Sequence, residues 1–158
     1  MMTNLPYRRN VAAIIFNQEG KIFIALRHDL VKEGIWAFPQ GGIDKDETPV
    51  QAIKRELHEE LGTDQFEILE EYQEWISYDF PKNILNNSLK HKYRGQIQKW
   101  FAVRFIGKDI DIRLDTHKNI EFARWNWIDL NELTTINVGY KKDLYRKISK
   151  HFAKYSIV

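Results

Sequence analysis

The sequence predicts an α/β fold in which a mixed β-sheet lies between helices, in an α/β/α arrangement. Short apolar runs separated by polar turns predict several strands, and two segments carry apolar residues at helical spacing. Hydrophobic residues make up 43% of the 158 residues, which is enough for a sizeable core. We therefore expect one domain that spans residues 1–158.

The first strands are predicted to form a β-hairpin. Apolar runs at residues 11–16 and 21–26 flank the turn sequence Asn-Gln-Glu-Gly. A third strand is predicted at residues 34–38. Residues 39–42, which contain two glycines, are expected to form a flexible turn where the backbone can approach a metal or a phosphate.

The clearest helix signal lies between Thr48 and Gly62. Thr48 is a favoured N-cap residue, Pro49 suits the first helical position, and Gly62 suits the end of a helix. The apolar residues between them recur at helical spacing, at Val50, Ile53, Leu57 and Leu61.

The rest of the chain predicts three further strands and a second helix. The strands are expected at residues 66–77, 98–106 and 124–128, and a polar loop at residues 81–95 is long enough to be functional or mobile. Residues 141–154 carry Leu144, Ile148 and Phe152 at helical spacing, which predicts an amphipathic helix.

Three glutamates of the first helix point to a metal-dependent enzyme. Glu56, Glu59 and Glu60 are spaced i, i+3 and i+4, so they project from one helix face and repel one another. Carboxylate oxygens are the ligands that Mg²⁺, Mn²⁺ and other hard divalent cations require. The alternative is an acidic, solvated helix face.

Composition excludes several other classes of site and protein. The chain has no cysteine, and its five histidines are too scattered to predict a zinc site. It has no apolar run long enough to cross a membrane and no secretion signal, so we expect a cytoplasmic protein without membrane attachment.

Basic residues are concentrated in two segments, while the net charge is only +2. One segment, residues 80–108, contains no acidic residue, and the other is the predicted C-terminal helix. This separation from the acidic helix suits a polyanionic substrate, although lysine-rich helices are more often solvated faces.

The segment around the first helix resembles the signature motif of the Nudix hydrolases. The matching positions are Gly41, Glu47, Arg55, Glu56, Leu57, Glu59, Glu60 and Gly62. Thr63 departs from the motif, which usually has an aliphatic residue there. The resemblance implies a Nudix fold and the hydrolysis of a phosphoanhydride by water.

The resemblance also implies roles for the motif residues. Glu56 and Glu60 would be the main metal ligands, Glu59 a further ligand or the base, and Gly41 a carbonyl ligand. Arg55 would orient the carboxylates, through Glu47. The identity of the general base stays open.

Patches over nearly the whole chain are similar to bacterial RNA pyrophosphohydrolases and related hydrolases of dinucleoside polyphosphates. Examples are Tyr7-Arg8-Arg9-Asn10-Val11 and Tyr140-Lys141-Lys142-Asp143. The similarity implies the removal of pyrophosphate from the 5′-triphosphate end of RNA, which leaves a 5′-monophosphate and starts mRNA decay. Hydrolysis of diadenosine tetraphosphate is the alternative, and a non-catalytic RNA-binding module is a third hypothesis. Protein partners cannot be inferred.

The same similarity implies a set of substrate-binding residues. These are Arg8, Arg27, Gln96, Tyr140 and Lys141, and Glu121 matches a further acidic residue near the metals. Arginine suits phosphate because its planar fork binds two oxygens, and tyrosine offers a face for a base. For Arg27 an exposed edge charge, for Tyr140 a core position and for Glu121 an ordinary ion pair are the alternatives.

Overall fold

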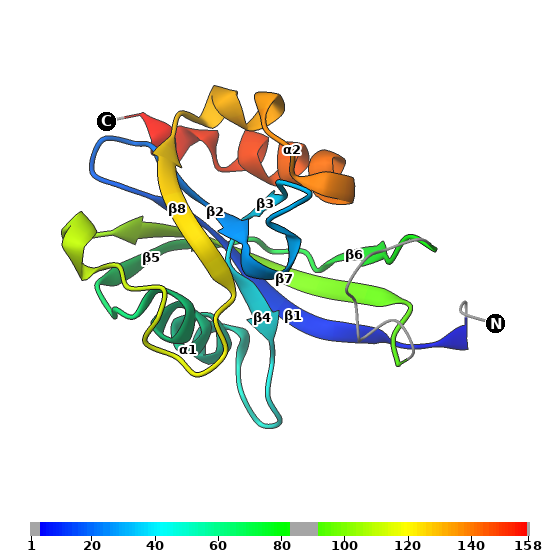
Figure 1. Ribbon diagram of the computed structural model, residues 1–158. Coiled ribbons are helices and arrows are strands. Elements are labelled where there is room, and N and C mark those ends of the chain that lie inside the picture. The colour runs from blue at the N-terminus through cyan, green and yellow to red at the C-terminus, as the bar shows by residue number, and fades with distance from the viewer. Residues whose placement is uncertain (1–3, 83–91, 158) are drawn as a thin grey trace.

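The computed structural model describes residues 4–82 and 92–157. In this part of the chain a mixed β-sheet lies between two α-helices, which confirms the predicted fold class (Figure 1). The helices are α1 (Pro49–Leu61) and α2 (Lys142–His151). The strands are β1 (Tyr7–Phe16), β2 (Ile22–Arg27), β3 (Trp36–Ala37), β4 (Gln40–Gly42), β5 (Phe66–Glu71), β6 (Ile76–Asp79), β7 (Gly95–Phe105) and β8 (Phe122–Ile128).

Strand β1 is the centre of the sheet. It runs parallel to β7 and antiparallel to β2 and β4. The register of β1 with β2 is Phe16↔Ile22, next to the hairpin turn, whereas β4 pairs with the first half of β1 at Asn10↔Gly42. Beyond the turn β2 pairs with β3 and β8. The two halves of the sheet therefore diverge.

Two hydrophobic cores cover the two faces of the sheet. Because side chains alternate along a strand, Val11, Ala13 and Ile15 of β1 belong to one core, and Ala12, Ile14 and Phe16 to the other. The first core contains buried residues of α1, namely Ala52, Ile53, Leu57 and Leu61. The second contains Tyr145, Ile148 and Phe152 of the C-terminal segment. Each helix thus buries its apolar face against one side of the sheet.

The ends of α1 follow the sequence signals. The Thr48 hydroxyl accepts a hydrogen bond from the backbone N–H of Gln51 (3.2 Å), and the Gln51 side chain accepts one from the N–H of Thr48 (2.9 Å). Gly62 ends the helix with a φ of 69°, a left-handed conformation that suits glycine. The predicted helix limits are confirmed.

Three sequence predictions need correction. Residues 39–42 are not a flexible turn, because residues 40–42 form strand β4, held by pairing with β1. The single strand predicted at residues 66–77 is two strands, β5 and β6, both paired with β7. The last helix ends at His151, and a 3-10 turn, Ala153–Ser156, follows it. Most of the predicted loop at residues 81–95 lies outside the described residues.

In the described part of the chain, no helix has the length and apolar character needed to cross a bilayer. Trp125 is partly buried: its ring stacks on that of Phe23 with centroids 5.5 Å apart and packs against the first core.

Candidate active site

A cavity of about 200 Å³ lies where the diverging strands meet the acidic face of α1. Its lining comes from β1, β3, β4, α1, the end of β2, the residues around the start of β8, and the 3-10 turn Gly139–Lys141. Most of the predicted site residues line it, namely Arg8, Arg27, Gly41, Glu56, Glu60, Glu121 and Lys141. We call it the polar cavity.

Arg55 holds the acidic side of the site together. Its guanidinium forms a two-pronged contact with the Glu47 carboxylate, with Nε to Oε2 at 2.8 Å and Nη2 to Oε1 at 2.9 Å. It also donates to Oε1 of Glu56 (2.8 Å) and to the carbonyl oxygen of Gly42 (2.8 Å). The arginine therefore fixes α1 to the strand that carries Gly41 and sets the position of Glu56.

Glu47 and Glu59 contact this arginine outside the lining of the polar cavity. The hydrogen bond from Arg55, the largest cause, lowers the pKa of Glu47. Glu59 lies farther away, with Oε2 at 3.4 Å from Nη1 of Arg55. The three neighbouring glutamates of α1 are thus divided, and only Glu56 and Glu60 line the cavity.

The carboxyls inside the cavity destabilise one another's charged forms. Burial is the main reason that the pKa of Glu60 lies well above its usual range, and repulsion from Glu56 and Glu121 adds to it. Burial also raises the pKa of Glu56, although the hydrogen bond from Arg55 opposes the shift. A cation among these groups would relieve the repulsion.

Glu121 faces the α1 carboxyls from the residue before β8. Loss of water around the group raises its pKa, while attraction to Arg27 lowers it. The structure thus brings Glu121 to the same cavity as Glu56 and Glu60, across some sixty residues of sequence.

Cationic side chains occupy other parts of the cavity wall. Lys141 lies in a 3-10 turn, Gly139–Lys141, and is only 7% exposed. Its Nζ donates to Oε1 of Gln40 (2.9 Å), and burial, aided by repulsion from Arg27, lowers its pKa to about 7. Arg27 pairs with Asp29 at 2.7 Å. A side chain at Gly42 would collide with Arg8, so the glycine gives that arginine room.

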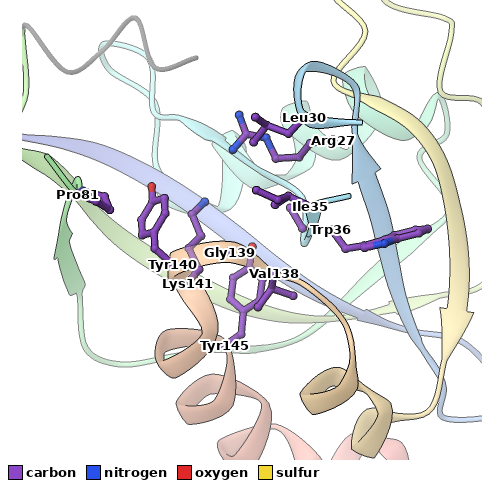
Figure 2. Close-up of a pocket in the computed structure, with 11 residues that line it drawn as sticks. Arg27, Leu30, Ile35, Trp36, Pro81, Val138, Gly139, Tyr140, Lys141 and Tyr145 are labelled. Carbon is purple, nitrogen blue, oxygen red and sulfur yellow. The ribbon is translucent and has the colours of Figure 1, made fainter. Parts of the chain in front are cut away.

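A second cavity, of about 240 Å³ and largely apolar, shares Arg27, Ala37 and Lys141 with the first. Figure 2 shows Arg27 and Leu30 on one side of this apolar cavity and Tyr140 and Lys141 on the other. Tyr140 is 41% exposed, so it is not a core residue, and its ring lies 5.8 Å from that of Tyr78.

Of the five predicted substrate-binding residues, Gln96 alone lines neither the polar cavity nor the apolar cavity. It is buried in β7, where its Nε2 donates to the hydroxyl of Tyr78 (2.9 Å). Gln96 therefore connects with Tyr140 through the Tyr78 ring.

Comparisons with known proteins agree with this geometry. The family model described as the NUDIX domain matches residues 6–152. The chain is a member of the Nudix family. A curated protein called RNA pyrophosphohydrolase from Gluconacetobacter diazotrophicus is 48% identical over 97% of this chain and 95% of its own length. One of the same name from Acidiphilium cryptum is 45% identical over 98% and 94%. In fold, the E. coli dihydroneopterin triphosphate pyrophosphohydrolase superposes with a TM-score of 0.71 at 18% identity, over 94% of this chain and 99% of that one.

Nudix hydrolases generally use divalent cations, and the residues of the polar cavity fit such an ion by their chemistry. Within the described residues, Glu60 Oε2 is buried without a hydrogen-bond partner. A side chain at Gly41 would collide with the Glu56 carboxylate, so only glycine allows this close approach of backbone to carboxylate. Among the described residues, however, no three acidic or histidine side chains already form a set of metal ligands.

The sequence analysis did not single out four polar residues near the polar and apolar cavities: Asn10, Gln40, Tyr78 and Gln98. Asn10 and Gln98 are fully buried in β1 and β7. An amide at the edge of an apolar strand was the available signal, because buried polar groups need partners. What those partners are depends on long-range pairing, which the sequence does not show.

Proposed function

We propose that this Nudix protein removes pyrophosphate from the 5′-triphosphate end of RNA and leaves a 5′-monophosphate. In this reaction water cleaves the phosphoanhydride bond between the α- and β-phosphates, and pyrophosphate and the 5′-monophosphorylated RNA are the two products. The names of the two relatives, which align over nearly their whole lengths, support this substrate.

The observation that carries the proposal is the shared wall of the two cavities. The polar cavity has carboxyls on α1 and cations at Arg8, Arg27 and Lys141, which suits a metal-bound polyphosphate. The apolar cavity begins at the same Arg27 and Lys141 and is lined by apolar and aromatic side chains. A nucleotide has these two parts, a polyphosphate and a base, joined through one ribose.

We assign metal binding to Glu56, Glu60 and the carbonyl of Gly41, with Glu121 on the same cavity wall. When bound, Mg²⁺ or a similar cation neutralises phosphate charge and lowers the pKa of the attacking water. Glu47 and Arg55 act on Glu56, because they hold its carboxylate in place. Glu59 stays a candidate for a further ligand or for the base.

The roles proposed for the cationic side follow from its contacts. Arg8, Arg27 and Lys141 bind phosphate oxygens, and exclusion of water from the buried Lys141 strengthens its attraction to them. Tyr140 offers an aromatic face at the mouth of the apolar cavity, where an unpaired base stacks. We place the activity in the cytoplasm.

The test is hydrolysis by the purified protein with Mg²⁺. Two substrates are compared, a 5′-triphosphorylated RNA with an unpaired 5′ end and diadenosine tetraphosphate, and the released phosphates are identified. We expect a higher kcat/KM for the RNA, with pyrophosphate and 5′-monophosphorylated RNA as products. A higher value for the dinucleotide, or no turnover of RNA, would reject the proposal. A Glu60→Gln protein controls for contaminating hydrolases.

A further inference from the structure

A buried hydrogen-bond network connects the polar cavity to the second core. Gln98 of β7 is fully buried, and its Nε2 donates to Oδ1 of Asn10 (2.8 Å) and to Oε1 of Gln40 (2.9 Å). On its other side, Oε1 of Gln98 accepts a hydrogen bond from the indole N–H of Trp100 (3.1 Å). Lys141 Nζ completes the network by donating to Oε1 of Gln40 (2.9 Å).

Trp100 and Lys141 together fix the directions of the hydrogen bonds in this network. The oxygen and nitrogen of an amide side chain look alike, so their placement must follow from a partner of known type. An indole N–H can only donate, so Gln98 must turn its oxygen toward Trp100. The amide nitrogen of Gln98 then faces Asn10 and Gln40, and both of these residues must accept its hydrogen bonds through their side-chain oxygens.

Asn10 is therefore left with its amide nitrogen turned away from the network. This Nδ2 is buried and has no hydrogen-bond partner among residues 4–82 and 92–157, although Asn10 lines the polar cavity. A buried N–H donor without an acceptor destabilises the folded protein. Because Asn10 lines the cavity, a molecule bound in the cavity can supply the missing acceptor. The network thus offers this cavity donors, at Asn10 Nδ2 and Lys141 Nζ.

We propose that Asn10 donates a hydrogen bond to a phosphate oxygen of the substrate, and that Gln98 and Trp100 are positioning residues that keep its nitrogen turned to the cavity. The inference rests on the proposed function in that it takes the polyphosphate to occupy the polar cavity. It adds a neutral donor to the cations Arg8, Arg27 and Lys141, and it gives a function to two residues of the sheet interior.

Binding is the most direct measurement, because it does not depend on turnover. The probe is a 5′-triphosphorylated dinucleotide in which a methylene group replaces the α–β bridging oxygen, and its Kd is measured by calorimetry with Mg²⁺. Asn10→Ala should raise the Kd about tenfold, since a hydrogen bond to a charged group is lost. Asn10→Asp should raise it further, because a carboxylate repels phosphate. The exposed Asn131→Asp is the matched control for charge and should bind like the wild type.

The positioning part of the proposal has its own test in Gln98→Glu. The new carboxyl group can donate at most one hydrogen bond in place of two. Lys141 keeps the oxygen of Gln40 turned to the network, so Asn10 turns its nitrogen to the carboxyl group and its oxygen then faces the cavity. The Kd should rise about as much as in Asn10→Ala, although Gln98 does not line the cavity. In turnover assays both variants should change KM more than kcat, whereas a general loss of structure would lower the melting temperature and kcat together.

A wild-type measurement removes the dependence on variants that fold poorly. In a ¹⁵N-labelled protein the side-chain NH₂ signal of Asn10 should shift when the probe is added. An unchanged signal, or a Kd within twofold of the wild type in both Asn10 variants, overturns the proposal. A wild-type Kd in Gln98→Glu overturns the positioning roles. The same titrations with a methylene analogue of diadenosine tetraphosphate keep the Asn10 contact measurable if the RNA activity itself is not found.

Discussion

Burial of Lys141 in the candidate active site lowers the free energy of unfolding, and this loss can be measured. Burial lowers the pKa of this lysine from 10.5 to about 7. The folded protein therefore holds fewer protons on this group than the unfolded chain between these two values. The cost to stability is complete below pH 7 and disappears as the pH rises toward 10.5. Replacing Lys141 with methionine, an apolar side chain of similar length, should remove that cost.

The magnitude follows from the two pKa values. Linkage gives a cost of about 4 kcal/mol at pH 7 and about 2 kcal/mol at pH 9. Methionine loses the hydrogen bond to Gln40 and the contact of Nζ with the Tyr78 ring, 5.5 Å from its centroid, which together are worth about 1–2 kcal/mol. We expect Lys141→Met to be more stable than the wild type by about 2 kcal/mol at pH 7, and by close to nothing at pH 9.

Urea unfolding at pH 6, 7, 8 and 9 measures this difference. Lys142→Met is the matched control for the substitution, because Lys142 is the exposed neighbour, and it should not reproduce the gain in stability at pH 7. Lys141→Met should also raise the KM for triphosphorylated RNA, since a phosphate ligand is lost. If the variant is less stable than the wild type at pH 6, or if the difference does not shrink as the pH rises, the reasoning about burial is refuted.

Three further predictions concern other buried or paired groups. Glu60→Gln should lower kcat about 100-fold and abolish the rise in melting temperature on addition of Mg²⁺, and a preserved rise would exclude Glu60 as a ligand. Tyr145→Phe should lower the free energy of unfolding by about 1–2 kcal/mol, because the buried N–H of Phe38 loses the hydroxyl that it meets at 3.2 Å. Partial burial would raise the pKa of Glu70, but hydrogen bonds from Tyr155 and its neighbours lower it to about 2. The stability from Glu70 is therefore present above pH 4.5 and is lost as the pH falls toward 2. Glu70→Gln should cost about 1–2 kcal/mol at pH 7 and flatten this acid dependence in urea unfolding.

Local signals in the sequence were sufficient for helix α1. Thr48, Pro49 and Gly62 mark its ends through interactions with residues no more than four positions away, so the sequence contains the whole argument. Strand β4 was missed for the opposite reason. Its glycines predict a turn, and they become a strand only because β1, some thirty residues earlier, provides the hydrogen bonds.

The candidate site shows the same division between local signals, which the sequence contains, and long-range contacts, which it does not show. Glu56 and Glu60 could be named because their spacing and the Nudix motif lie on one helix. Spacing alone did not separate Glu59 from them, because that depends on where Arg55 places its guanidinium. The burial of Lys141 was also not predictable, since a lysine at the start of a basic helix normally faces water, and here the turn Gly139–Lys141 brings it against Gln40.

In the described part of the chain, no direct ion pair joins the acidic and the cationic side chains that line the polar cavity. Carboxylates and cations line the same small space, yet these side chains contact other residues. Among the described residues, Glu56 contacts Arg55 and Arg27 contacts Asp29. Lys141 contacts the neutral Gln40. If Glu56 or Glu60 paired directly with Arg27 or Lys141, the site would be more stable, but metal and phosphate would have to break those pairs. The supporting residues therefore keep both signs available, so that little reorganisation is needed when a metal-bound polyphosphate enters. This arrangement explains why buried charge that weakens the folded state is retained at this end of the sheet.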